Sequence, residues 1–111
     1  MQIHVTFRHL ETSEALRDHA DKKMEKFKKY LHEPIEVHLV FSVQKKIHQV
    51  AEVTIKAKHF HFHGIEESED MYTSIDKLAS KVERHLVKHK EKVKDHRALP
   101  THEAAPLLSE N

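Results

Sequence analysis

Residues 35–57 read IEVHLVFSVQKKIHQVAEVTIKA, and this stretch indicates the fold class. Apolar and polar side chains alternate before and after Lys45-Lys46. The apolar positions are Ile35, Val37, Leu39, Phe41 and Val43, then Ala51, Val53, Ile55 and Ala57. Strict alternation is typical of a strand with one buried and one solvated face. Because only a short polar segment separates the two runs, we expect adjacent antiparallel strands joined by a tight turn.

Two more strands are predicted on either side of this pair. In residues 2–8, Ile3, Val5 and Phe7 alternate with polar side chains, and residues 59–64 read HFHFHG. The second pattern places Phe60 and Phe62 on one face and three histidines, His59, His61 and His63, on the other. We therefore expect a sheet of four strands whose outer face is polar and rich in histidine.

Two amphipathic helices complete the predicted fold. Apolar residues recur at steps of three or four from Leu16 to Leu31, which predicts a helix over 13–31, and again from Met71 to Val93, which predicts a helix ending near Arg97. The acidic segment 66–70 is expected at the start of the second helix, where negative charge suits the helix dipole. The order β-α-β-β-β-α predicts an α+β, two-layer sandwich with both helices on one sheet face and a parallel first strand pair.

Length and composition exclude several classes of protein. The 111 residues suffice for one domain, assigned to 1–97, and residues 98–111 lack periodicity and are expected to form a flexible tail. With no cysteine and 1 glycine, the chain cannot form disulfides, thiolate zinc sites or a glycine-rich phosphate loop. The first residues, MQIHV, lack the basic start and apolar core typical of a signal peptide, and no apolar run reaches membrane length, so neither feature is expected. No catalytic constellation is evident. We expect a cytoplasmic monomer without enzymatic activity or cofactor.

Basic residues form a row on each predicted helix. Lys77, Lys81, Arg84 and Lys88 are spaced four, three and four, which places them on one face away from the apolar stripe, with His85 and Lys92 beside them. In the first helix, Lys22, Lys26 and Lys29 cluster opposite the core side, and Lys23 lies on the shoulder. If the helices lie side by side, the two rows border one cationic surface suited to phosphate backbones. The alternative is a pair of solvated faces with ion pairs to nearby acids such as Asp21 and Glu83.

A metal site at His59, His61 and His63 is not expected. Imidazole suits zinc, nickel or copper, but a site needs side chains that converge on one ion. Three side chains from one straight strand diverge instead. The prediction is therefore that the protein binds no metal there.

The last predicted helix carries a longer pattern. Residues 70–78 read DMYTSIDKL, followed by Lys81, Arg84, Leu86 and Lys88-His89-Lys90, and residues 14–17 read EALR. This pattern resembles the ribosome hibernation-promoting factors, also described as ribosome-associated translation inhibitors or sigma-54 modulation proteins. The resemblance implies a fold related to double-stranded RNA-binding domains and a function that involves binding without catalysis. The length of the chain resembles the short forms of the family.

The resemblance also implies partners and site residues. The expected target is the small (30S) ribosomal subunit, alone or in the 70S ribosome, where the protein would occupy the tRNA and mRNA channel on 16S rRNA and block translation in stationary or starved bacteria. A separate ribosome modulation factor is a possible second partner. With Lys77 from the spacing, the expected rRNA-binding residues are Lys23, Lys26, Lys29, Lys77, Lys81, Arg84, Lys88 and Lys90, followed by Lys22, His85 and Lys92. Two other functions stay open, a general double-stranded RNA-binding module and a regulator that binds protein.

Overall fold

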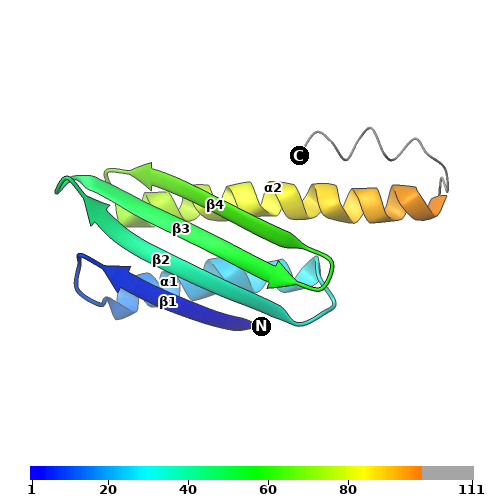
Figure 1. Cartoon of the computed structure of the whole chain (residues 1–111), viewed down its shortest axis with the longest axis horizontal. Coiled ribbons are helices and arrows are strands. Elements are labelled where there is room, and N and C mark those ends of the chain that lie inside the picture. Colours follow the sequence, from blue (N-terminus) through cyan, green and yellow to red (C-terminus); the bar gives the residue numbers. More distant parts are fainter. Residues whose placement is uncertain (99–111) are drawn as a thin grey trace.

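A computed structural model describes the backbone of residues 1–98 and the side chains of residues 1–92 (Figure 1). The elements are β1 (Gln2–Arg8), α1 (Glu14–Glu25), the 3-10 helix η1 (Lys26–Lys29), β2 (Ile35–Gln44), β3 (His48–Ala57), β4 (His61–Ser68) and α2 (Met71–Ala98). The four strands lie in the order β1-β2-β3-β4. The β1 and β2 strands are parallel, and the other neighbours are antiparallel. The predicted α+β fold and the parallel first pair are confirmed.

Both helices cover the same face of the sheet, as Figure 1 shows. The core lies between the two layers. Its most deeply buried side chains come from β2, β3 and the apolar stripes of the helices, and they include Val37, Leu39, Phe41, Val53, Ala20, Met24, Ile75, Leu78 and Val82. These are the positions that the two periodicities predicted. Burial of one sheet face and one stripe per helix therefore accounts for the two-layer arrangement.

The β2–β3 turn reverses the chain without a glycine. Lys45 and Lys46 adopt φ angles of 53° and 68°, in the left-handed region that glycine usually occupies. Left-handed turn residues let the chain reverse in a way that matches the right-handed twist of the two strands. The turn therefore forms where the sequence predicted it.

The first helix ends earlier than predicted. The structure has α-helix only to Glu25, and Lys26–Lys29 form a tighter 3-10 turn in which the Tyr30 N–H donates to the Phe27 carbonyl at 3.0 Å. Short 3-10 segments are common at helix ends. Here the tighter turn keeps both Phe27 and Leu31 buried as the chain leaves for β2. The prediction of one helix over 13–31 was wrong at its end, because this packing decides the local geometry.

The acidic segment 66–70 does not sit on the helix as predicted. Residues 66–68 belong to β4, where Glu66 pairs with Lys81 at 2.6 Å and Glu67 pairs with His48 at 2.9 Å. Only Asp70 caps α2, where its Oδ2 accepts the Thr73 N–H at 3.0 Å. Pairing with β3 extends β4 past Gly64. Glu66 and Glu67 therefore lie in the sheet and form ion pairs with Lys81 and His48, and they do not cap the helix.

We expect Asp70→Ala to lower the free energy of unfolding by about 1 kcal/mol, because the Thr73 N–H then loses its partner at the start of α2. Urea denaturation followed by circular dichroism measures the change. Glu69→Ala is the matched control, since Glu69 is exposed and equally acidic, and it should change stability by only a few tenths of a kcal/mol. Equal losses in the two variants would contradict the capping role.

The predicted tail begins at residue 98, whereas the structure still has Ala98 in α2. The rest of the predicted tail, residues 99–111, lies outside the described residues. Among the described residues, no helix is long and apolar enough to cross a membrane.

Candidate nucleic-acid interface

The basic row of α2 runs along the β4 edge of the sheet. Lys81 Nζ lies 2.6 Å from Glu66 Oε2 and 3.5 Å from the Ile65 carbonyl oxygen, while Lys77 Nζ lies 3.4 Å from the Glu67 carbonyl oxygen. These acceptors all belong to β4. The row therefore borders the sheet edge and faces away from α1, although the helical layer carries both.

Arg84 and Lys88 are the most available charges of this row. Both are exposed, and they flank a shallow hollow on α2 that Ser80, Glu83, Val87 and Glu91 also line. Among the described side chains, residues 1–92, no carboxylate lies within 4.0 Å of either cation. Lys81, by contrast, is only 31% exposed and is held by Glu66. Arg84 and Lys88 can thus accept an external anion without breaking an existing ion pair.

The basic row of the first helical segment spans α1 and η1. Lys22, Lys26 and Lys29 are exposed, and Lys29 Nζ lies 5.2 Å from the centre of the Tyr30 ring. Lys23 is more constrained, because its Nζ lies 3.4 Å from Asp76 Oδ1 on α2. The structure therefore separates Lys23, which joins the two helices, from three lysines that point into solvent.

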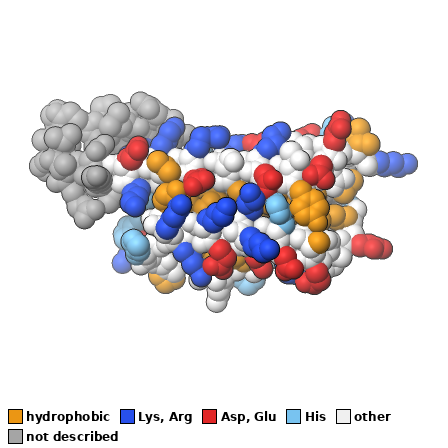
Figure 2. Space-filling view, turned by 180° about the vertical axis from the view of Figure 1, so that it is seen from behind, with side chains coloured by type: hydrophobic (Ala, Val, Ile, Leu, Met, Phe, Trp, Pro, Cys, Tyr) orange, Lys and Arg blue, Asp and Glu red, His pale blue; other side chains and the backbone are white. Residues whose placement is uncertain are grey.

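An acidic seam divides the two rows. On α2, Asp76 lies 2.7 Å from His19 Nε2, and Glu83 accepts a hydrogen bond of 2.8 Å from the Tyr30 hydroxyl. Figure 2 shows the same division on the helical face, with blue side chains in two lengthwise bands and red ones between them. The expected single cationic surface is thus two cationic bands with carboxylates in between. No local sequence signal could have revealed this seam, since Asp76 and its partner His19 are 57 positions apart.

The seam also changes acidities. Burial raises the pKa of Asp76, but the His19 hydrogen bond and the Lys23 charge outweigh it and hold that pKa below its ordinary value. The hydrogen bond to Glu83 raises the pKa of the Tyr30 hydroxyl. Asp76 is therefore ionised at neutral pH, where its contacts with His19 and Lys23 stabilise the packing of α1 against α2.

Histidines extend the α2 row towards the β3–β4 hairpin. Lys88 and Lys92 line a hollow with four imidazoles, those of His59, His61, His85 and His89. The His85 ring packs at 4.8 Å from the Phe62 ring, and the His89 ring meets the Phe60 ring edge to face at 5.3 Å. The second group of predicted residues, His85 and Lys92, thus lies beside Lys88. Lys90, another predicted rRNA-binding residue, is exposed on the same helix.

The three alternating histidines do not share one face. His61 and His63 lie on β4, but His59 lies in the hairpin, where its N–H donates to Glu33 Oε2 at 2.7 Å. This hydrogen bond is the main cause that lowers the pKa of Glu33. The prediction of three histidines on one strand face was therefore wrong for His59, because β4 begins at His61.

We expect His89→Leu to reduce the loss of stability in acid. Burial lowers the pKa of His89, whereas Glu33 raises it and His59 and Lys92 lower it. An unfolded histidine takes up a proton near its ordinary pKa of about 6.5 while the folded one resists, so stability falls as pH drops through this value. The leucine variant has no such proton to take up.

The variant should therefore gain stability relative to the native chain on going from about pH 8 to about pH 5.5. Urea denaturation at both pH values measures it. His32→Leu, which removes an exposed histidine, is the control. An identical pH dependence in the two variants would contradict the role of burial at His89.

The fold and this surface together define a small α+β protein whose helical layer carries two cationic bands. Residues 3–94 match the family model described as sigma 54 modulation protein / S30EA ribosomal protein, and the chain belongs to this family. The ribosome hibernation promoting factor of Escherichia coli K12 is 35% identical over 96 residues, 86% of this chain and 100% of that protein. The factor of Salmonella typhimurium is 34% identical over the same shares.

Solved structures agree with this assignment. The N-terminal domain of Thermus thermophilus Protein Y superposes with a TM-score of 0.75 at 26% identity, over 80% of this chain and 99% of that one. A ribosomal subunit interface protein from Coxiella burnetii gives 0.70 at 28% identity, over 82% and 99%. The predicted family and its fold are confirmed. Membership of this non-enzymatic family also confirms the prediction that the protein is not an enzyme.

Proposed function

We propose that this protein is a bacterial ribosome hibernation factor that binds the small ribosomal subunit in the tRNA and mRNA channel and blocks translation. Its relatives are named ribosome hibernation promoting factor and ribosomal subunit interface protein. The observation that carries the proposal here is the exposed pair Arg84 and Lys88, two cations without a carboxylate partner among residues 1–92.

The proposed mechanism is steric and electrostatic. Side chains of both bands contact phosphates of folded 16S rRNA and recognise its shape and backbone more than its base sequence. Each contact releases counterions, which makes binding sensitive to salt. The acidic seam keeps the two bands apart, so the surface fits two separate phosphate rows better than one.

The predicted site residues rank differently once their neighbours are known. The exposed cations should contribute most to the affinity for rRNA, and they are Lys22, Lys26, Lys29, Lys77, Arg84, Lys88 and Lys90. Lys23 and Lys81 are already paired with Asp76 and Glu66, so their binding contribution should be smaller and their structural one larger. His85 and Lys92 add charge at the hairpin end of the α2 row.

Co-sedimentation with vacant ribosomes on sucrose gradients, at low and high salt, tests the function. Migration with 30S and 70S particles that weakens at high salt supports the proposal. A peak of paired ribosomes only after addition of a separate modulation factor would identify that second partner. Protein that remains at the top of the low-salt gradient refutes ribosome binding.

Two other functions would give different results. Equal affinity for free duplex RNA and for the small subunit would favour a general RNA-binding module. Activity that survives neutralisation of the lysine rows would favour a regulator that binds protein.

A further inference from the structure

The outer face of the sheet holds a cluster of metal-ligating side chains that lies apart from the helical layer. In the parallel register of β1 and β2, His4 lies opposite His38, and Glu36 precedes His38 by two residues on the same face. The two imidazole rings stack with centroids 4.8 Å apart. One ligand atom from each of the three side chains lies within 4.8 Å of the other two. We propose that His4, Glu36 and His38 bind one divalent transition-metal ion, with zinc as the best match.

The ligand types fit this ion. Two imidazoles and one carboxylate are common zinc ligands, and water completes a tetrahedron. Zinc bonds of about 2.0–2.1 Å place tetrahedral ligand atoms about 3.3 Å apart. Ligand atoms as far apart as 4.8 Å therefore need to approach by about 1.5 Å, while His38 Nε2 and Glu36 Oε2, now 2.7 Å apart, need to separate slightly. The side chains of His38 and Glu36 are 45% and 47% exposed. They can therefore rotate into place without disturbing the core.

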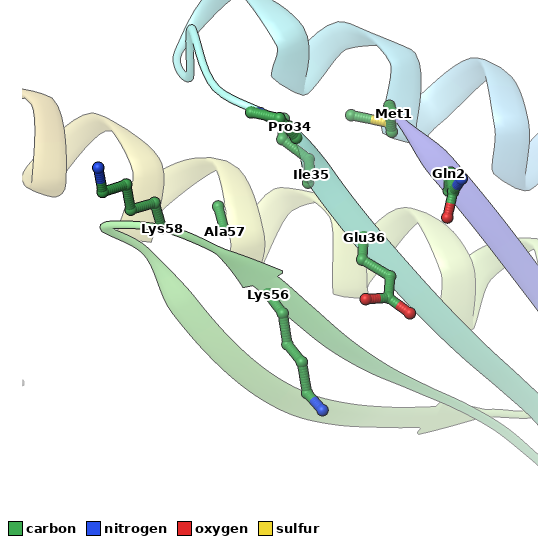
Figure 3. Close-up of a pocket in the computed structure, with 8 residues that line it drawn as sticks. All are labelled: Met1, Gln2, Pro34, Ile35, Glu36, Lys56, Ala57 and Lys58. Atoms are coloured by element: carbon green, nitrogen blue, oxygen red, sulfur yellow. The ribbon is translucent and has the colours of Figure 1, made fainter.

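An existing hydrogen bond marks the place that the ion would take. His38 Nε2 lies 2.7 Å from Glu36 Oε2, and this bond is the main cause that lowers the pKa of Glu36, helped by the charges of His38, His4 and Lys56. A metal ion bridging the same nitrogen and oxygen would replace the shared proton, so binding releases protons. Lys56 opposes a cation, since it pairs in register with Glu36; Figure 3 shows the two side chains projecting from neighbouring strands.

Other histidines of the sheet lack a third ligand. His63 Nε2 pairs with Glu52 Oε2 at 2.6 Å, and His48 pairs with Glu67, each as a simple pair. Among the described residues, His4, Glu36 and His38 form the group of three whose ligand atoms converge. The sequence drew attention to His59, His61 and His63, but only the last two lie on β4 and His59 lies in the hairpin. The ligand atoms of His4, Glu36 and His38 instead converge across two neighbouring strands.

The site would bridge β1 and β2 on the face opposite the helices. An ion there ties the edge strand β1 to the sheet and leaves the cationic bands free. The proposal therefore does not depend on ribosome binding.

Isothermal titration of the full chain with zinc chloride at about pH 7.5 tests the site. We expect one saturable micromolar site in the native protein. The double variant His4→Gln/His38→Gln should bind at least about 10-fold more weakly, because it loses two of three protein ligands. His61→Gln/His63→Gln is the matched control, since it removes two exposed histidines from β4 on the same sheet, and it should bind like the native protein.

Thermal unfolding with and without zinc gives a second readout. Zinc should raise the unfolding temperature of the native protein and of the control, but not of His4→Gln/His38→Gln, because an ion that binds only the folded state stabilises it. Circular dichroism without metal checks that each variant is folded. Absence of saturable binding to the native protein, or equal weakening in the two double variants, overturns the proposal.

Discussion

Reversing two charges in Arg84→Glu/Lys88→Glu should weaken binding to vacant ribosomes by about 10- to 100-fold at moderate salt. Both side chains are exposed, and no carboxylate among residues 1–92 neutralises either of them. Each substitution therefore replaces attraction to a phosphate with repulsion. The slope of log affinity against log salt concentration should also fall by about one unit for each lost contact.

A matched control separates local contacts from total charge. Lys45→Glu/Lys46→Glu produces the same change in net charge at the β2–β3 turn, which belongs to neither helix. Its affinity and salt slope should stay close to those of the native protein. Filter binding or co-sedimentation over a salt series measures all three proteins. The proposed interface is wrong if both double variants lose affinity equally, or if neither does.

Paired and unpaired lysines should also differ. Lys81→Gln should affect ribosome binding less than Lys88→Gln, because Glu66 holds Lys81 at 2.6 Å before any RNA arrives. The same variant leaves Glu66, itself only 23% exposed, without its partner, so it should lower stability more than Lys88→Gln does. The reverse order in both measurements would contradict a mainly structural role for Lys81 and a mainly RNA-binding role for Lys88.

Phe41→Ala should lower the free energy of unfolding by about 3–5 kcal/mol. Phe41 lies in the second strand of the sheet, is fully buried, and meets the Phe7 ring of β1 edge to face at 5.6 Å. Its truncation removes buried apolar surface and leaves a cavity where two strands and the helical layer meet. Small domains are stable by only about 5–15 kcal/mol, so much of the variant's stability is lost.

Urea denaturation followed by circular dichroism measures this loss. Val40→Ala is the control, because Val40 is the neighbour of Phe41 on the outer sheet face and is only partly buried. Its effect should stay near about 1 kcal/mol or below. A similar loss in both variants would mean that the inner face of β2 does not form the core described here.

The alternation in residues 2–8, 35–57 and 59–64 and the two apolar stripes were enough to predict four strands, two helices and a shared buried face. Each of these signals is local, because burial of one strand face or one helix face imposes its period on neighbouring residues. The helix positions of Arg84 and Lys88 follow from the same period. Their exposure could therefore be predicted before any tertiary contact was known.

Boundaries were less predictable where packing competes with propensity. The 3-10 turn at Lys26–Lys29 and the extension of β4 to Ser68 both depend on contacts with other elements. The segment 66–70 is a clear example, since its charge suggested a helix start, while pairing with β3 draws Glu66 and Glu67 into the sheet. Local charge carries no information about that pairing.

The sequence by itself thus determined the order of elements, the core and the two rows of lysines, because each repeats with the period of its own element. Only the tertiary structure decided which cations are free. Asp76 meets Lys23 and His19, and Glu66 meets Lys81, across distances in sequence that no short pattern spans. The same holds for His4 and His38, which come together because the parallel register of β1 and β2 aligns them.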